Sequence, residues 1–219
     1  MPSGAEPADG PEALAARERL VDELARALPR VAPAVLSALR SVPRHLFMPG
    51  ASLAEAYDDH AHAIGHGQTI SQPTVVALMT DALELRGGER VLEVGTGSGY
   101  QAAVLARLGA RVHSIERIET LAREAAARIA RLVPGDVVVH VGDGATGLPR
   151  EAPFDRILLT AAARRLPEEL LEQLAPGGIL VAPVGDEEQW LGVWREGRSA
   201  REGRWICPVR FVPLIRSDA

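Results

Sequence analysis

The sequence predicts a doubly wound α/β domain with a mostly parallel sheet, an N-terminal helical cap and a C-terminal antiparallel hairpin. From Arg90 onward, short β-branched runs alternate with helical stretches. Such alternation implies right-handed βαβ units and a sheet covered on both faces. Before Arg90 the pattern is helical, and near the C-terminus two apolar runs flank a glycine-bearing stretch. We therefore expect a disordered tail over residues 1–10, a cap with a long loop over 11–85, and a core over 86–219.

The helical cap is predicted from the spacing of apolar residues. Leu14, Leu20, Val21, Leu24 and Leu28 recur at near-helical spacing and predict a helix over 11–28. A shorter helix is expected over 33–39, and the proline-containing residues 42–50 indicate an irregular connector. Residues 57–71 have no period and predict a structured loop, after which Pro73 suits the first position of a helix to about residue 85.

The core elements follow in alternation. Strands are predicted over 91–94, 111–116, 136–141, 154–160 and 178–184, and helices over 99–108, 118–132 and 167–174. The segments 189–196 and 203–215 predict the closing antiparallel hairpin.

Composition narrows the classes of protein that the chain can belong to. With 47% hydrophobic and 24% charged residues, the 219-residue chain matches ordinary globular proteins, which excludes a disordered chain or a simple coiled coil. No apolar run approaches the roughly 18 residues of a membrane span. The N-terminus has no export signal and Cys207 is the single cysteine, so a cytoplasmic location is expected. The net charge of −5, with all basic residues arginine and no basic stripe, disfavours nucleic acid as a partner.

A glycine-rich turn follows the strand 91–94 and leads into a helix. It contains Gly95, Gly97 and Gly99, preceded by Glu93. Ligands bind at the carboxyl ends of parallel strands, where such a turn lets the backbone approach them closely. The dinucleotide fingerprint is not met, because the third glycine comes one residue early, and a Walker-type loop needs a lysine that the chain lacks. The turn instead resembles motif I of the S-adenosylmethionine-dependent methyltransferases.

Two further acids follow the next two predicted strands. Glu116 ends the second strand, where a carboxylate can accept the ribose hydroxyls of a nucleoside. Asp143, between Gly142 and Gly144, follows the third strand and is placed to receive an adenine amino group. Each signal alone is also compatible with a tight turn or a solvated strand end. Their occurrence at three successive strand ends indicates a site for a cationic cofactor without phosphates.

Most of the chain, from about residue 33 to 215, resembles the protein-L-isoaspartate (D-aspartate) O-methyltransferase family. The segments that carry this resemblance are VPRHLF (42–47), AYDDHAHAIGHGQTISQP (56–73), VLEVGTGSGYQAAVLARLG (91–109), VHSIERI (112–118), GDG (142–144), FDRILLTAAA (154–163), LLEQLAPGGILVAPVG (170–185) and VRFVPL (209–214). The glycine turn is common to many methyltransferases, whereas the GQTIS-QP segment is specific to this family. The substrate expectation therefore depends on that segment.

The resemblance implies a Rossmann-like class I methyltransferase core over 86–219, behind a cap and substrate loop over 11–85. It implies a protein-repair enzyme that uses S-adenosyl-L-methionine, yields S-adenosyl-L-homocysteine, and methylates the free α-carboxylate of L-isoaspartyl and D-aspartyl residues. It also implies a monomeric enzyme that binds no metal. The implied catalytic residue is Ser71, and the implied cofactor-binding residues are Thr69, Ile70, Ser71, Glu93, Gly95, Thr96, Gly97, Gly99, Glu116, Arg117, Asp143 and Gly144.

The chain departs from the family pattern in two places. His60-Ala61-His62-Ala63 stands where the family usually has a proline-rich stretch, and Arg164-Arg165 stands where it more often has proline and an acid. Both segments are expected near the substrate cleft, so the preference for flanking peptide sequence is expected to differ.

The chemistry of an isoaspartyl substrate sets what the site must do. Its α-carboxylate has a reference pKa of about 3.3–3.7, so it is ionised at neutral pH and needs no general base. Orientation of the reacting groups then supplies most of the rate, and well-oriented reactants gain roughly 7–11 kcal/mol. We hypothesise that Ser71 positions the carboxylate through one hydrogen bond and is not itself a nucleophile.

Several alternatives stay open at the level of sequence. A related enzyme could methylate aspartate in one dedicated peptide during its maturation. Base methyltransferases usually end the fourth strand in an Asn/Asp-Pro-Pro-Tyr element, whereas this strand ends Thr160-Ala161-Ala162. A regulatory module without catalysis would not need an intact Ser71. His60, His62 and His66 lack the frame of a zinc site and are interpreted as loop residues.

Overall fold

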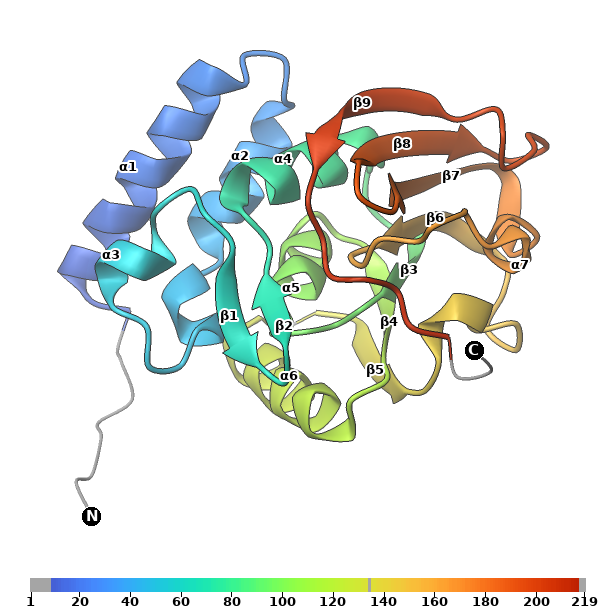
Figure 1. Cartoon of the computed structure of the whole chain (residues 1–219). Helices are drawn as coiled ribbons and strands as arrows, with labels where there is room; N and C mark the ends of the chain where they lie inside the picture. The colour runs from blue at the N-terminus through green and yellow to red at the C-terminus, as the bar shows by residue number, and fades with distance from the viewer. Residues whose placement is uncertain (1–8, 134, 217–219) are drawn as a thin grey trace.

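The computed structural model describes residues 9–133 and 135–216 and has a seven-stranded central sheet (Figure 1). Its strand order is β5-β4-β3-β6-β7-β8-β9, so the chain reverses direction across the sheet between β3 and β6. Ligands of doubly wound folds bind at such a switch point, outside the carboxyl ends of the strands. Buried side chains form one cluster with Val91 and Leu158, and a second with Leu92 and Ile157. Consecutive strand residues therefore enter different clusters, as expected for a sheet buried on both faces.

The parallel core follows the predicted alternation closely. It comprises β3 (Arg90–Val94), α5 (Tyr100–Arg107), β4 (Arg111–Glu116), α6 (Glu119–Leu132), β5 (Val137–Val141) and β6 (Phe154–Leu159). The strand β3 pairs in parallel with both β4 and β6, and β4 with β5. The predicted fold class is confirmed.

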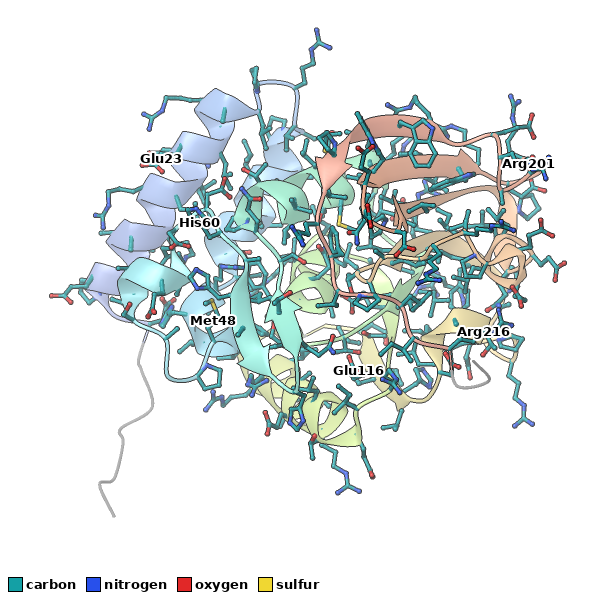
Figure 2. All side chains as sticks on the ribbon, in the orientation of Figure 1. Glu23, Met48, His60, Glu116, Arg201 and Arg216 are labelled. Atoms are coloured by element: carbon teal, nitrogen blue, oxygen red, sulfur yellow. The ribbon has the colours of Figure 1, made fainter. Side chains whose placement is uncertain are left out.

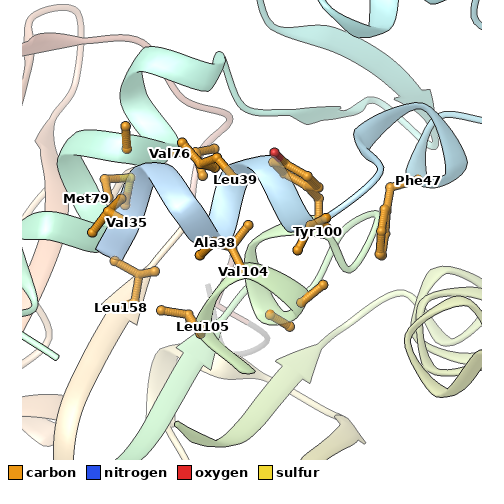
Figure 3. Packing of buried hydrophobic residues seen from close by; sticks show 14 of the residues in the cluster. Val35, Ala38, Leu39, Phe47, Val76, Met79, Tyr100, Val104, Leu105 and Leu158 are labelled. Carbon is orange, nitrogen blue, oxygen red and sulfur yellow. The ribbon is translucent and has the colours of Figure 1, made fainter. Parts of the chain in front are cut away.

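The N-terminal cap contains α1 (Pro11–Ala27), α2 (Pro33–Ser41), the short 3₁₀ helix η1 (Arg44–Phe47), α3 (Leu53–Ala56) and α4 (Pro73–Ala82). The helices α1, α2 and α4 all have proline in the first helical turn. A backbone N–H at that position has no partner within the helix, so proline costs no hydrogen bond there. Figure 3 shows Val35 and Leu39 of α2 beside Val76 and Met79 of α4, with Val104 of α5 next to them. This apolar packing joins the cap to the core. The predicted boundary between cap and core at residue 85 remains a proposal, because both parts contribute side chains to the same apolar cluster.

The segment predicted as a loop over 57–71 contains a small hairpin. The strands β1 (His62–Gly65) and β2 (Gln68–Ile70) pair antiparallel around a turn in which Gly65, His66 and Gly67 have positive φ. These strands could not be predicted, because three or four residues are too few to show the alternation of apolar and polar side chains that identifies a strand. The hairpin leads directly into Ser71.

In the C-terminal part, one helix and one strand are shorter than predicted, and another strand begins earlier. The helix α7 spans only Glu168–Leu171, and β7 (Leu174–Gly185) begins within the helix predicted to residue 174. The antiparallel strands β8 (Gln189–Arg195) and β9 (Arg204–Val209) form the expected hairpin, but β9 ends six residues before the predicted limit of 215.

Residues 210–215, here called the C-terminal segment, leave the hairpin and cross the carboxyl ends of the parallel strands (Figure 1). The N–H of Ala162 donates to the carbonyl of Val212 at 2.8 Å, and the N–H of Leu214 donates to the carbonyl of Ala162 at 2.7 Å. Pro213 has no N–H with which to continue a strand ladder. The consequence is a cover over one side of the expected ligand site.

The expected disordered tail, residues 1–10, lies outside the described residues except for Asp9 and Gly10. Among the helices that the structure describes, none is both long enough and apolar enough to cross a membrane.

Candidate active site

Two adjoining cavities lie at the carboxyl ends of the strands and share Gly95. The first, of about 50 Å³, lies between the end of β4 and the C-terminal segment and is called the β4 cavity. The second, of about 30 Å³, lies between Ser71 and the glycine loop and is called the Ser71 cavity. Wider hollows of about 480 and 590 Å³ on the cap contain none of the predicted site residues. The site is therefore assigned by chemistry and not by volume.

The glycine loop forms the common wall of the two cavities. Gly95 has φ +100°, in the left-handed region that favours glycine. A Cβ atom at Gly95 would collide with the Oγ1 atom of Thr160. Thr160 directly follows the neighbouring strand β6, and its hydroxyl donates to the carbonyl of Gly95 at 2.6 Å. The loop can therefore pass close to β6 only without a side chain at this position.

Glu116, at the carboxyl end of β4, lies against the same loop (Figure 2). Its Oε2 atom accepts from the backbone N–H of Gly97 at 3.0 Å, and its Oε1 atom accepts from the N–H of Ile118 at 3.0 Å. A carboxylate has about four acceptor positions, so both oxygens retain capacity for hydroxyl groups. Glu116 lines the β4 cavity together with Arg117.

Glu93 lies beneath the loop and not in either cavity. Its side chain is fully buried and accepts a hydrogen bond from the Ser114 hydroxyl, which in turn contacts the Thr96 hydroxyl at 2.6 Å. Among the residues that the structure describes, none is a hydrogen-bond partner of its Oε1 atom. Burial raises the pKa of Glu93 to about 8, the Ser114 hydrogen bond opposes this shift, and the charge of Glu116 adds to it. Glu93 thus connects to the site through Ser114 and Thr96.

Asp143 begins the 3₁₀ turn η2 (Gly144–Thr146), where its Oδ1 atom accepts from the N–H of Ala145 at 2.9 Å. Gly144 lines the β4 cavity, while Asp143 is outside the residues that line it. A Cβ atom at Gly144 would press against Val94, so a larger residue would displace the wall of the cavity. The position of this turn places backbone groups, and not the carboxylate, at the cavity surface.

Ser71 lies between β2 and α4 and lines the cavity named after it, with Thr69 and Ile70. Within the described part of the chain, no side chain or backbone group bonds the Ser71 hydroxyl, which can therefore donate to a ligand. The Ser71 carbonyl accepts from the Nη2 atom of Arg44 at 2.9 Å. Arg44 thus holds the backbone of Ser71 through its carbonyl, and the Ser71 hydroxyl is left available to a ligand.

The structure brings together most of the predicted site residues. Those that line the cavities are Thr69, Ile70, Ser71, Gly95, Thr96, Gly97, Glu116, Arg117 and Gly144. Glu93, Gly99 and Asp143 are outside both linings, in supporting positions. The histidines of the 60–63 segment both contact Asp58, His62 at 2.7 Å and His60 at 3.7 Å. The described residues include no group of three potential metal ligands.

Sequence reasoning missed several residues that line the cavities. They are Gln68, Val76, Val94, Ser98, Tyr100, Gln101, Ile115, Thr160, Ala161, Pro213, Leu214 and Ile215. Thr160 could have been found, since it stands at the end of a predicted strand, where ligands bind. The C-terminal residues gave no such signal, because their segment was predicted to continue the hairpin.

A sequence model of the family described as protein-L-isoaspartate (D-aspartate) O-methyltransferase matches residues 15–219 of this chain. A protein-L-isoaspartate O-methyltransferase from Maricaulis maris (strain MCS10) is 53% identical over 190 residues, which are 84% of this chain and 87% of that protein. One from Methylorubrum extorquens (strain PA1) is 49% identical over 217 residues, 98% of this chain and 94% of that protein.

Two solved structures share the fold over nearly the whole chain. A protein-L-isoaspartate O-methyltransferase superposes with a TM-score of 0.80 at 28% identity, over 90% of this chain and 65% of that longer one. A Plasmodium falciparum protein described as a putative member of the same enzyme class, in complex with S-adenosyl-L-homocysteine, gives 0.79 at 25% identity, over 91% of this chain and 98% of that one.

Proposed function

The chain belongs to the protein-L-isoaspartate (D-aspartate) O-methyltransferase family, and from the residues of its two cavities we propose how it holds its substrates. Its activity is the transfer of a methyl group from S-adenosyl-L-methionine to the free α-carboxylate of L-isoaspartyl residues in damaged proteins. The residue roles given below are our assignments.

The residues of the β4 cavity fit the nucleoside part of S-adenosyl-L-methionine. Glu116 offers carboxylate oxygens for ribose hydroxyls at the end of β4. Ile115, Leu214 and Gly144 provide the apolar, close walls that a planar base needs. The lining combines the acceptor oxygens of Glu116 with backbone groups and one described cation, Arg117, which suits a ligand that is cationic and has no phosphates.

The Ser71 cavity fits the reacting end of the ligand pair. When bound, S-adenosyl-L-methionine supplies an electrophilic methyl group. Gly95 and Gly97 present backbone along one wall, and Ser71 presents a hydroxyl on the other. Thr96, buried under this wall, is fixed by its contact with Ser114. The cavity thus has one rigid polar wall and one hydroxyl that faces it.

Ser71 binds the isoaspartyl carboxylate by donating one hydrogen bond, and it orients one carboxylate oxygen toward the glycine loop. The carboxylate is already ionised at neutral pH, so no side chain has to remove a proton. A single donor is sufficient to orient the anion, whereas several strong hydrogen bonds would stabilise the nucleophile in its ground state. Exclusion of water from the Ser71 cavity when both ligands fill it favours a reaction in which opposite charges cancel.

The observation that carries these assignments is the shared wall: Gly95 lines both cavities, so one ligand can extend from Glu116 to Ser71. We also propose that the protein acts as a monomer in the cytoplasm, a reducing compartment in which its single cysteine, Cys207, would stay reduced. The net charge of −5 supports a protein or peptide partner and disfavours nucleic acid.

A methyl-transfer assay with paired synthetic peptides tests the function. An isoaspartyl peptide and its aspartyl twin differ only in the position of the carboxylate, and we expect turnover of the first alone. A Ser71→Ala variant should lose at least 10-fold in kcat/KM for the isoaspartyl peptide while it retains affinity for S-adenosyl-L-homocysteine. Preference for the aspartyl twin would refute the repair function, and a methylated Ser71 would refute the positioning role.

A further inference from the structure

Arg44 is buried at the junction of three segments that form the site. Its side chain is 0% exposed, and it belongs to η1 in the cap. The Nε atom donates to the carbonyl of Ala56 at 3.0 Å, and the Nη2 atom donates to the carbonyl of Ser71 at 2.9 Å. The guanidinium carbon lies 5.0 Å from the centre of the Tyr100 ring.

Tyr100 connects this cation to the glycine loop. It is the first residue of α5, directly after Gly99, and it lines the Ser71 cavity. Its ring also contacts Phe47 edge to face with ring centres 5.7 Å apart, and Figure 3 shows these two residues next to α2. Arg44 therefore contacts the backbone of Ser71 on one side and the residue that ends the glycine loop on the other.

Asp59 holds the other end of the same short segment. Its Oδ1 atom accepts from the N–H of Thr74 at 2.8 Å, and its Oδ2 atom accepts from the Thr74 hydroxyl at 2.7 Å and from the Gln72 amide at 3.0 Å. Thr74 lies in the first turn of α4, where a carboxylate is favoured by unpaired N–H groups. The backbone from Ser71 to Thr74 is thus held at both ends by groups of opposite charge.

We propose that Arg44 and Asp59 are positioning residues that set the place of the Ser71 hydroxyl relative to the glycine loop. This inference rests on the proposed role of Ser71. Neither side chain is among those that line the Ser71 cavity, so both act through the backbone that carries the serine. Displacement of a reacting group by about 1 Å can cost 10²-fold in rate, which makes such anchoring kinetically important.

The chemistry of each residue suits this role. A guanidinium donates through a rigid planar fork to two carbonyls at once, which a lysine ammonium on a flexible stem does not reproduce. Burial lowers the pKa of Arg44, and nearby Tyr100, Asp58 and Asp59 oppose that shift. The nearby negative groups thus offset only part of the effect of burial on this cation.

Kinetics of Arg44→Lys and Asp59→Asn, each compared with wild type on the isoaspartyl peptide, test the proposal. We expect kcat to fall by about 10- to 100-fold for Arg44→Lys and about 5- to 10-fold for Asp59→Asn. Calorimetric affinity for S-adenosyl-L-homocysteine should stay within about 3-fold of wild type in both, because the β4 cavity is unchanged. Added guanidinium ion, with ammonium as control, should partly restore kcat in an Arg44→Ala variant.

Asp22→Asn is the matched control for Asp59→Asn. Asp22 is exposed on α1 and contacts Arg40, away from the 71–74 segment, so its kcat should stay within about 2-fold of wild type. Unchanged kcat in Arg44→Lys or Asp59→Asn would overturn the proposal. So would a loss of cofactor affinity as large as the loss of kcat, since that indicates general unfolding. If Arg44→Lys does not fold, the kcat of Asp59→Asn alone decides whether the proposal holds. An inactive wild type would instead refute the proposed function.

Discussion

The carboxylate of Glu116 accepts a hydrogen bond from the backbone N–H of Gly97 at 3.0 Å, so the last residue of β4 holds the centre of the loop that follows β3. This contact gives Glu116 two functions in one place. It fixes the wall shared by the cavities, and it offers its remaining acceptor positions to a bound nucleoside.

Substitution of Glu116 tests both functions. Glu116→Gln removes the charge and replaces one acceptor oxygen by a donor, so we expect affinity for S-adenosyl-L-homocysteine to fall at least 10-fold in calorimetry. Glu124→Gln is the control, because Glu124 is exposed on α6 and pairs only with Arg128 in the described structure. Equal affinities for the two variants would show that Glu116 does not contact the cofactor.

Gly95 cannot accept a side chain. Gly95→Ala should lower the free energy of unfolding by about 2 kcal/mol or more, from left-handed strain and from the collision with Thr160. It should also abolish cofactor binding, because the wall of both cavities would move. Gly67→Ala has a similar positive φ of +69° but open space around its Cβ, and should cost only about 1 kcal/mol in urea unfolding. A Gly95→Ala protein as stable as Gly67→Ala would contradict this account.

Glu93 should make stability depend on pH in a defined direction. Burial raises its pKa from 4.5 to about 8, so between these values the folded protein holds a proton that the unfolded chain releases. The resulting stabilisation is complete below pH 4.5 and is lost as the pH rises toward 8. Glu93→Gln lacks this proton equilibrium. Between pH 5 and 8.5, the variant should therefore gain about 1–4 kcal/mol relative to wild type in denaturant unfolding. Parallel pH profiles for the two proteins would rule out a protonated Glu93.

His113 should act in the opposite direction. Its ring stacks on His140 with 3.2 Å between their nitrogens, and burial, with Arg90 and His140, lowers its pKa below 6.5. The unfolded chain therefore binds a proton first as the pH falls below 6.5, and stability is lost on acidification. His113→Gln should remove up to about 1 kcal/mol of the difference between the free energies of unfolding measured in denaturant at pH 7.5 and 5.5. A variant that keeps the wild-type difference would contradict this account.

The parallel core and the glycine loop could be predicted because their determinants are local. Hydrophobic periodicity distinguishes strands from helices, and the left-handed turn at Gly95 needs glycine whatever surrounds it. Since parallel strands align their carboxyl ends, residues that follow successive strands meet at one edge. Glu116 and Asp143 were predicted in this way; Glu116 lines the β4 cavity, whereas Asp143 is outside its lining and its neighbour Gly144 is within it.

The sequence by itself therefore determined the order of the core elements, the edge of the sheet at which ligands bind, and the family resemblance carried by the segment around Ser71. Only the tertiary structure decided that Glu93 lies beneath the loop, that residues 213–215 line the β4 cavity, and that Arg44 reaches the backbone of Ser71. The physical reason is sequence separation: Arg44 and Ser71 are 27 residues apart, and Ala162 and Leu214 are further still. Such contacts depend on how whole elements pack, which no local pattern of residues records.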